Sequence, residues 1–235
     1  MSGGDPLSGS EELRQIVTRL WTTPEHAEWV PKTDVISLSY LREWMGSSDV
    51  EIVGFANAMI HNSRFRIEPP LSIDEYVSFE KGYYERCLRE NLDGEWSDSR
   101  YSAGYDLENI FAALWRDEQV PRAILLGLKK WLGELYEAGS HEIRTCIVQA
   151  TLEHLFEQKP IRTFFSDWKD DSILRLAYEE ARLWPDGGGG THLGKPPAAV
   201  DEQWRYLRMR DDLWVAPLGA TLNRARIAAS AAEVP

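Results

Sequence analysis

Apolar residues recur along this chain at spacings of three and four, so one face of each successive segment is hydrophobic. This period fits an α-helix and does not fit a β-strand, in which apolar and polar residues alternate. The pattern therefore predicts a series of amphipathic helices, whose apolar stripes run over Leu13–Trp21, Val35–Met45, Ile52–Ile60, Tyr76–Leu88, Leu107–Trp115, Ile124–Leu135, Ile143–Phe156, Ile161–Trp168 and Ile173–Ala181.

Several of these segments begin with residues that are typical of helix N-termini. Ser48 and Glu51 in SDVE, and Ser72 and Glu75 in LSIDEY, have the spacing of a capping box. In this motif the serine hydroxyl and the glutamate carboxylate each accept a hydrogen bond from a backbone N–H of the first turn. Ser140 is the predicted cap of the helix that follows it. The local sequence therefore predicts where these helices start.

A β-structure is not expected. No segment shows a convincing strand alternation except WRYLRMRDDLWV, residues 204–215, which fits a helix and a strand equally poorly. We therefore predict an all-α protein, either an irregular multi-helix bundle or a HEAT-like stack of helical hairpins, with a tethered C-terminal segment.

The predicted organisation has three parts. Residues 1–184 form an acidic helical domain, of which residues 1–9 are expected to be disordered. Residues 185–199 are a Gly/Pro-rich linker, and residues 200–235 are a C-terminal segment that is partly helical and has a disordered tail. The apolar residues with which this last segment is able to dock on the helical domain are Trp204, Leu207, Leu213 and Trp214.

The formal net charge is −12 at pH 7, and it is unevenly distributed. Residues 1–190 carry 33 acidic and 20 basic side chains, a charge of −13, whereas residues 191–235 carry 5 and 6, a charge of +1. An acidic surface repels phosphate groups, so we expect no direct binding to nucleic acid and none to a membrane. A basic protein would be attracted, and an acidic surface that serves only solubility is the alternative.

The chain contains no local motif for a catalytic, cofactor or metal site. Cys87 and Cys146 lie within apolar helical patterns and are expected to be inert core thiols in a reducing compartment. No Glu-x-x-His pairs or zinc-spaced cysteines occur, and Gly187–Gly190 lacks the Lys-Ser/Thr of a phosphate-binding loop. Catalytic residues, cofactors and metal ligands are therefore not assigned. Because no export signal or membrane-spanning run occurs, the expected location is the cytoplasm.

The stretch LEHLFE, residues 152–157, places an acid beside a histidine within an apolar helical segment. At 100° per residue, His154 falls in the centre of an apolar stripe and Glu153 points roughly 100° away, so the two cannot converge on one ligand. We therefore expect His154 to be a buried, hydrogen-bonded residue of a central helix. A role as a ligand or proton-transfer group is the alternative.

The stretch DGEWSDSRYSAGYD, Asp93–Asp106, combines acids with aromatic residues and is predicted to be an inter-helix loop. Aromatic side chains on loops often anchor protein interfaces, and acids steer a basic partner toward them. The alternative is that these aromatics fold back and cover one end of the bundle. On the first interpretation, the partner-binding residues are Trp96, Asp98, Tyr101, Tyr105 and Asp106.

In size, acidity, helical content and lack of catalytic motifs, the chain resembles bacterial toxin-immunity proteins, which are small inhibitors that cover a toxin's active surface. This resemblance is one of general character and implies no residue assignments. It implies a non-enzymatic protein that neutralises a basic toxin. Two alternatives remain: an all-α enzyme with a pocket between helices, in which His154 and Tyr105 are the acid–base groups, and a helical scaffold subunit.

Overall fold

The computed structural model describes residues 34–61 and 65–185, and it confirms the predicted all-α fold for this part of the chain. The predicted helix at Leu13–Trp21, nearly all of the linker and the C-terminal segment lie outside the described residues. The helices are α2 (Leu38–Met45), α3 (Val50–His61), α4 (Ile73–Glu90), α5 (Arg100–Arg116), α6 (Arg122–Ala138), α7 (His141–Cys146), the π-helix η2 (Ile147–Leu152), α8 (Glu153–Glu157), α9 (Lys159–Phe164), the 3₁₀-helix η3 (Ser166–Asp170) and α10 (Leu174–Leu183).

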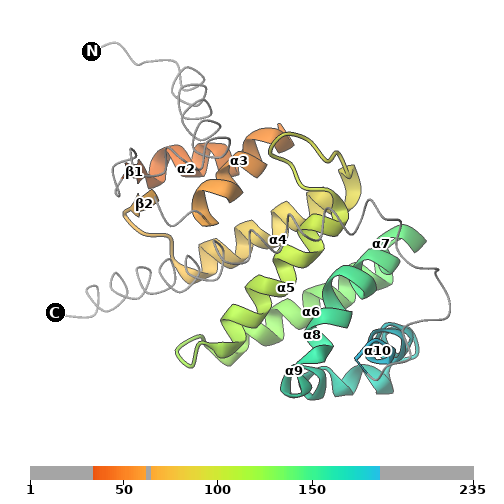
Figure 1. The fold of residues 1–235 in the computed structure, drawn as a ribbon. Coiled ribbons are helices and arrows are strands. Elements are labelled where there is room, and N and C mark those ends of the chain that lie inside the picture. Colours follow the sequence, from red (N-terminus) through yellow and green to blue (C-terminus); the bar gives the residue numbers. More distant parts are fainter. Residues whose placement is uncertain (1–33, 62–64, 186–235) are drawn as a thin grey trace, which may run out of the picture.

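The helices are arranged around α4 and α5, which lie side by side in the middle of the molecule (Figure 1). On one side, α3 packs against α4 and α2 packs against α3. On the other side, the continuous segment α7–η2–α8 packs against α5, and α10 returns to contact η2, α8 and α6. Because α10 folds back in this way, the described residues form an irregular bundle, the first of the two predicted architectures.

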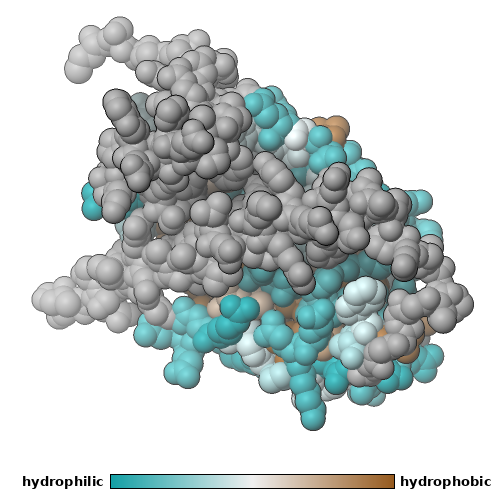
Figure 2. Space-filling model, viewed as in Figure 1, coloured by the Kyte–Doolittle hydropathy of each residue, from teal (hydrophilic) through white to brown (hydrophobic). Residues whose placement is uncertain are grey.

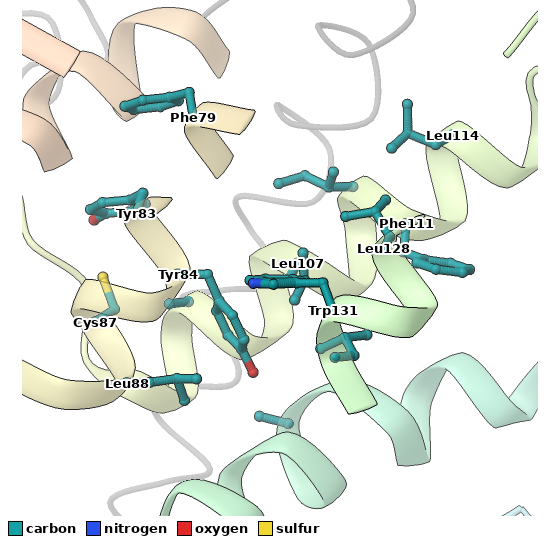
Figure 3. Packing of buried hydrophobic residues seen from close by; sticks show 14 of the residues in the cluster. Phe79, Tyr83, Tyr84, Cys87, Leu88, Leu107, Phe111, Leu114, Leu128 and Trp131 are labelled. Atoms are coloured by element: carbon teal, nitrogen blue, oxygen red, sulfur yellow. The ribbon is translucent and has the colours of Figure 1, made fainter. Parts of the chain in front are cut away.

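Large aromatic and aliphatic side chains fill the core between α4, α5 and α6 (Figure 3). Tyr84 of α4 and Trp131 of α6 meet edge to face, with ring centroids 5.7 Å apart. Trp131 Nε1 donates a hydrogen bond of 2.7 Å to Glu85, so the polar atom of this buried indole is satisfied. At Gly104, α5 approaches η2 so closely that an added Cβ would lie 2.6 Å from the Cβ of Ala150. A glycine is therefore needed where these two helices meet.

The expectation that the chain has no strands was wrong at one place. The strands β1 (Asp34–Ser37) and β2 (Phe65–Glu68) form a two-stranded parallel sheet in which Ile36 pairs with Ile67. Both isoleucines are buried, at 5% and 8% exposure. Parallel strands require a long crossover, and here α2 and α3 provide it. Because each strand has four residues and its partner is distant in sequence, the local pattern did not indicate it.

Two of the predicted helix caps are confirmed and one is wrong. Ser72 Oγ accepts a hydrogen bond from the backbone N–H of the third residue of its helix, over 3.2 Å, and Ser140 accepts one in the same position. At the start of α3, however, the capping oxygen is Asp49 Oδ1, which accepts from Glu51 N over 2.9 Å. Ser48 is not the cap, and the Glu51 carboxylate reaches a different part of the fold.

The central segment 141–157 is not one regular α-helix, because its middle is the π-helix η2. Ile147, Val148, Ala150, Thr151 and Leu152 of this π-helix are all buried, with at most 1% exposure. The prediction of a central helix that is covered on more than one side is therefore confirmed. A π-helix within an α-helical run is uncommon and often occurs near functional residues.

Candidate functional site

The predicted loop Asp93–Asp106 is a loop only in its first half. Helix α4 ends at Glu90 and is capped by Asn91, which has φ of 47°. Helix α5 begins after Ser99, whose hydroxyl accepts a hydrogen bond from Ser102 N over 3.2 Å. Tyr101, Tyr105 and Asp106 therefore lie on α5 and not on a loop. The prediction missed this helix start because RYSAGYD is rich in small and polar residues. The cap at Ser99 and the apolar spacing of Ala103 and Leu107 were the signals that pointed to it.

Glu51 of α3 holds the loop in place. Its carboxylate accepts hydrogen bonds from Trp96 N over 2.9 Å, from Ser97 N over 3.2 Å and from the Ser97 hydroxyl. The loop backbone also lies directly on Gly54, where an added Cβ would overlap the carbonyl group of Trp96. The indole ring of Trp96 packs edge to face on Phe55, with ring centroids 5.1 Å apart. Trp96 therefore faces the core, as the alternative interpretation expected.

Asp98 fixes the other end of the loop to α4. Tyr83 Oη donates to Asp98 Oδ2 over 2.7 Å and accepts from Asp98 N over 3.0 Å. Trp96 and Asp98 thus both hold the loop against the helices. A role for these two residues in partner binding stays a prediction, and their contacts give them a structural role in addition.

His154 lies at the edge of the core and not at its centre. Its side chain is 21% exposed, whereas the next residue, Leu155, is fully buried. The cause is η2, because a π-helical turn contains one residue more than an α-helical turn. One additional residue rotates every later side chain by about 100° around the helix axis. This rotation moves His154 out of the stripe in which regular α-helical spacing placed it.

The rotation brings His154 into a row of aromatic side chains from three elements. The rings of His154 and Tyr105 on α5 have centroids 5.2 Å apart, and those of His154 and Trp184, directly after α10, are 6.4 Å apart. Tyr101, one helical turn before Tyr105, donates from its hydroxyl to Gln149 Oε1 on η2 over 3.2 Å. Trp184 is 47% exposed and Tyr101 is 39% exposed, so the row reaches the surface.

Acidic side chains surround this aromatic row. His154 Nδ1 lies 3.6 Å from a carboxylate oxygen of Glu157. Burial, together with the negative charge of Glu180 on α10, raises the pKa of Glu153 from 4.5 to about 7. Burial lowers the pKa of His154, against an opposing effect of Glu157. We define the acidic–aromatic face as Tyr101, Tyr105, Glu153, His154, Glu180 and Trp184.

A buried ion pair that the sequence did not indicate lies between α3 and α4. His61 Nε2 is 2.8 Å from Glu80 Oε1, and the two side chains are only 2% and 4% exposed. The ring of Tyr76 lies edge to face with that of His61, with centroids 5.8 Å apart. Burial lowers the pKa of His61, but Glu80, Asp106 and Asp98 together outweigh this effect and raise it. Asp106, a predicted partner residue, thus acts electrostatically on this buried pair.

The cysteines behave as the sequence predicts. Cys87 and Cys146 are free and buried, with exposures of 1% and 0%. Burial raises the pKa of each thiol to about 12, so neither is a nucleophile near neutral pH. Within residues 34–61 and 65–185, no group of three or more His, Cys, Asp or Glu side chains is placed to hold a metal ion. In the same part of the chain, no helix is long and apolar enough to cross a membrane.

No family model, curated protein or solved structure matches this chain. The case for a function therefore depends on the chemistry of the acidic–aromatic face and of the buried His61–Glu80 pair. Of these, only the acidic–aromatic face has side chains that reach solvent.

Proposed function

We propose that this protein is a non-enzymatic binding protein whose acidic–aromatic face takes a basic protein partner. The observation that carries the proposal is the row of aromatic rings around His154 that reaches the surface at Trp184, next to the half-buried Glu153. Burial of Glu153, together with the negative charge of the exposed Glu180, raises the pKa of Glu153 and so destabilises its charged form. A cation brought by a partner would stabilise that charged form.

The aromatic row suits such a cation equally well. The faces of Trp and Tyr rings attract guanidinium and ammonium groups, with Trp the best of them. Trp and Tyr also supply large contact areas with few rotatable bonds, and both are enriched among residues that dominate binding energy. Trp184 and Tyr101 are exposed enough to make these contacts. An arginine side chain that inserts between Glu153 and Trp184 would therefore gain two favourable interactions at once.

The overall charge supports the same partner. With a net charge of −12, the protein accelerates the approach of a positively charged protein, and this effect weakens as salt increases. Immunity proteins that inhibit basic toxins combine an acidic surface with a rigid helical body, and the described bundle offers both. We propose neutralisation of a basic bacterial toxin as the biological role.

The test uses purified basic proteins encoded beside this gene, with binding measured by calorimetry at low and high salt. We expect one of them to bind, and the double substitution Trp184→Ala with Tyr101→Ala to weaken binding by at least about ten-fold. Tyr40→Ala is the matched control, since Tyr40 is 54% exposed on α2 at the opposite end of the molecule (Figure 1). If no basic protein binds, or if the double variant binds as the unmodified protein does, the proposal is wrong.

One observation favours an enzyme as the second candidate. The structure brings Tyr105 and His154 into ring contact, and Glu153 beside them has a pKa of about 7. Groups that titrate near neutral pH are suited to proton transfer. Tyr105→Phe separates the two proposals, because it removes the hydroxyl but keeps the ring. A catalytic role predicts loss of function in this variant, whereas a binding role predicts that partner affinity stays within about two-fold.

A further inference from the structure

The outer side of α10 and its two flanking residues carries an exposed apolar stripe. Ile173, Leu176, Leu183 and Trp184 are 41%, 59%, 47% and 47% exposed. At 100° per residue these side chains and Glu180 fall within an arc of about 100°. The side of the helix next to this arc is buried in the bundle through Ala177, Tyr178 and Ala181. Helix α10 is thus apolar over more than half of its circumference.

This concentration of exposed apolar residues is unusual for the molecule. On the side shown in Figure 2, the described residues are mainly hydrophilic, and hydrophobic residues show only in small areas. Of the eight large hydrophobic side chains that are exposed in the described part of the chain, four lie within residues 173–184. A helix with a second apolar stripe normally packs against a further element. The stripe also joins the acidic–aromatic face, because Trp184 and Glu180 belong to both.

We propose that residues 200–215 of the same chain bind this stripe and place an arginine beside Glu180 and Glu153. The sequence of this segment, VDEQWRYLRMRDDLWV, has a net charge of −1, with two acids on each side of a central cluster over residues 204–210 that combines large apolar residues with arginines. That cluster, WRYLRMR, has three arginines and no acid, which complements two carboxylates beside aromatic rings. The apolar residues that would contact the stripe are Trp204, Leu207, Leu213 and Trp214.

The length of the chain permits this contact. Residue 200 follows the last described residue, Pro185, by 15 positions, and 15 extended residues span at most about 50 Å. Helix α10 has ten residues and is about 15 Å long, so every point of the stripe is within reach. A short tether holds its segment at an effective concentration on the order of 1 mM. Even a contact with a dissociation constant of about 0.1 mM would then be formed roughly nine-tenths of the time.

The inference rests on the proposed function in one respect, since it makes residues 200–215 a competitor for the face that takes the partner. A segment that is bound for nine-tenths of the time lowers the apparent affinity of the partner about ten-fold. A basic partner would have to displace it. The C-terminal segment would therefore select for partners that bind the face more tightly than the protein's own arginines do.

Disulfide trapping in the full chain tests the contact without any partner. The variant carries Leu183→Cys on α10 and Tyr206→Cys in the segment, and the matched control carries Tyr40→Cys with Tyr206→Cys. The two native cysteines are buried and do not compete. We expect the intramolecular disulfide to form at least about ten-fold faster in the test variant than in the control, and addition of Trp204→Ala to slow it toward the control rate. Circular dichroism verifies that each variant is folded.

Equal rates of disulfide formation in the test variant and its control would overturn the inference. Disulfide-linked dimers as the main product would also overturn it, because they would identify a second copy of the chain as the occupant. Neither result bears on the partner-binding test with Trp184→Ala and Tyr101→Ala. Conversely, fast trapping in a protein that binds none of the basic proteins tested would support the intramolecular contact and refute the proposed function.

Discussion

Replacing Glu153 by glutamine should stabilise the protein at neutral and alkaline pH. Most substitutions of partly buried residues destabilise, so this expectation is specific to the arrangement of α8 and α10. Glu153 is half-buried and experiences the negative charge of Glu180, so the folded state opposes its ionisation, chiefly through burial. Glutamine keeps the shape and hydrogen-bonding capacity of the side chain but removes the charge.

The magnitude follows from the pKa. In the unfolded chain Glu153 loses its proton near its ordinary pKa of 4.5, whereas in the folded protein the pKa is about 7. At 1.36 kcal/mol per pKa unit, the difference corresponds to at most about 3.4 kcal/mol. Because solvent screens a half-buried group, we expect about 1 kcal/mol. The destabilisation is absent below pH 4.5, grows as the pH rises toward 7, and is complete above pH 7.

The assay is urea unfolding of the unmodified protein and of Glu153→Gln at pH 4.5 and pH 8. At pH 8 the free energy of unfolding of the variant should be higher by about 1 kcal/mol, and at pH 4.5 the two should agree within about 0.3 kcal/mol. Glu137→Gln, at an exposed position on α6, is the control and should change neither value. A variant that is equally or less stable at pH 8 would refute the argument that burial and the charge of Glu180 together oppose the ionisation of Glu153.

Three further expectations concern the core. Glu80→Gln leaves His61 buried without its anionic partner and should lower the free energy of unfolding by about 3 kcal/mol in urea titrations. Because the pKa of His61 is raised in the folded protein, the stabilisation from this pair is complete below pH 6.5 and is lost as the pH rises through that raised pKa. Comparison of the free energy of unfolding at pH 6 and pH 9 would detect this loss. Gly54→Ala forces a methyl group against the loop backbone at Trp96. It should lower the free energy of unfolding by about 2 kcal/mol or more, measured as a lower midpoint in urea. Cys87 and Cys146 should resist thiol reagents at pH 8 in the native protein and react in urea, and labelling of either native thiol would contradict their burial.

Features that depend on neighbours in sequence were predictable. The amphipathic helices and the caps at Ser72 and Ser140 follow from residues within one or two turns of each other, and the structure confirms them. The strand pair was not predictable, because β1 and β2 each have four residues and 27 residues separate them. The buried pair was missed for a similar reason, since Glu80 lies 19 positions after His61 on a different helix.

The candidate site was predicted in part. The sequence indicated Tyr101 and Tyr105 as surface aromatics near acids, and the structure places both in the acidic–aromatic face, although on a helix. It did not indicate Trp184 or Glu180, because their proximity to Tyr105 depends on how α10 folds back onto α8. The rotation of His154 was also hidden, since packing and not local propensity decides where a helix adopts a π turn.

The π-helix η2 makes this face depend on the number of residues in the chain as well as on their identity. Deletion of one residue within 147–152 would restore ordinary α-helical winding and turn His154 back toward the interior, while leaving every residue of the face unchanged. In an evolutionary comparison, a related chain with a single-residue gap at this point would therefore have the same fold but should have lost the proposed binding surface. A variant with such a deletion that still bound the partner with full affinity would contradict this dependence.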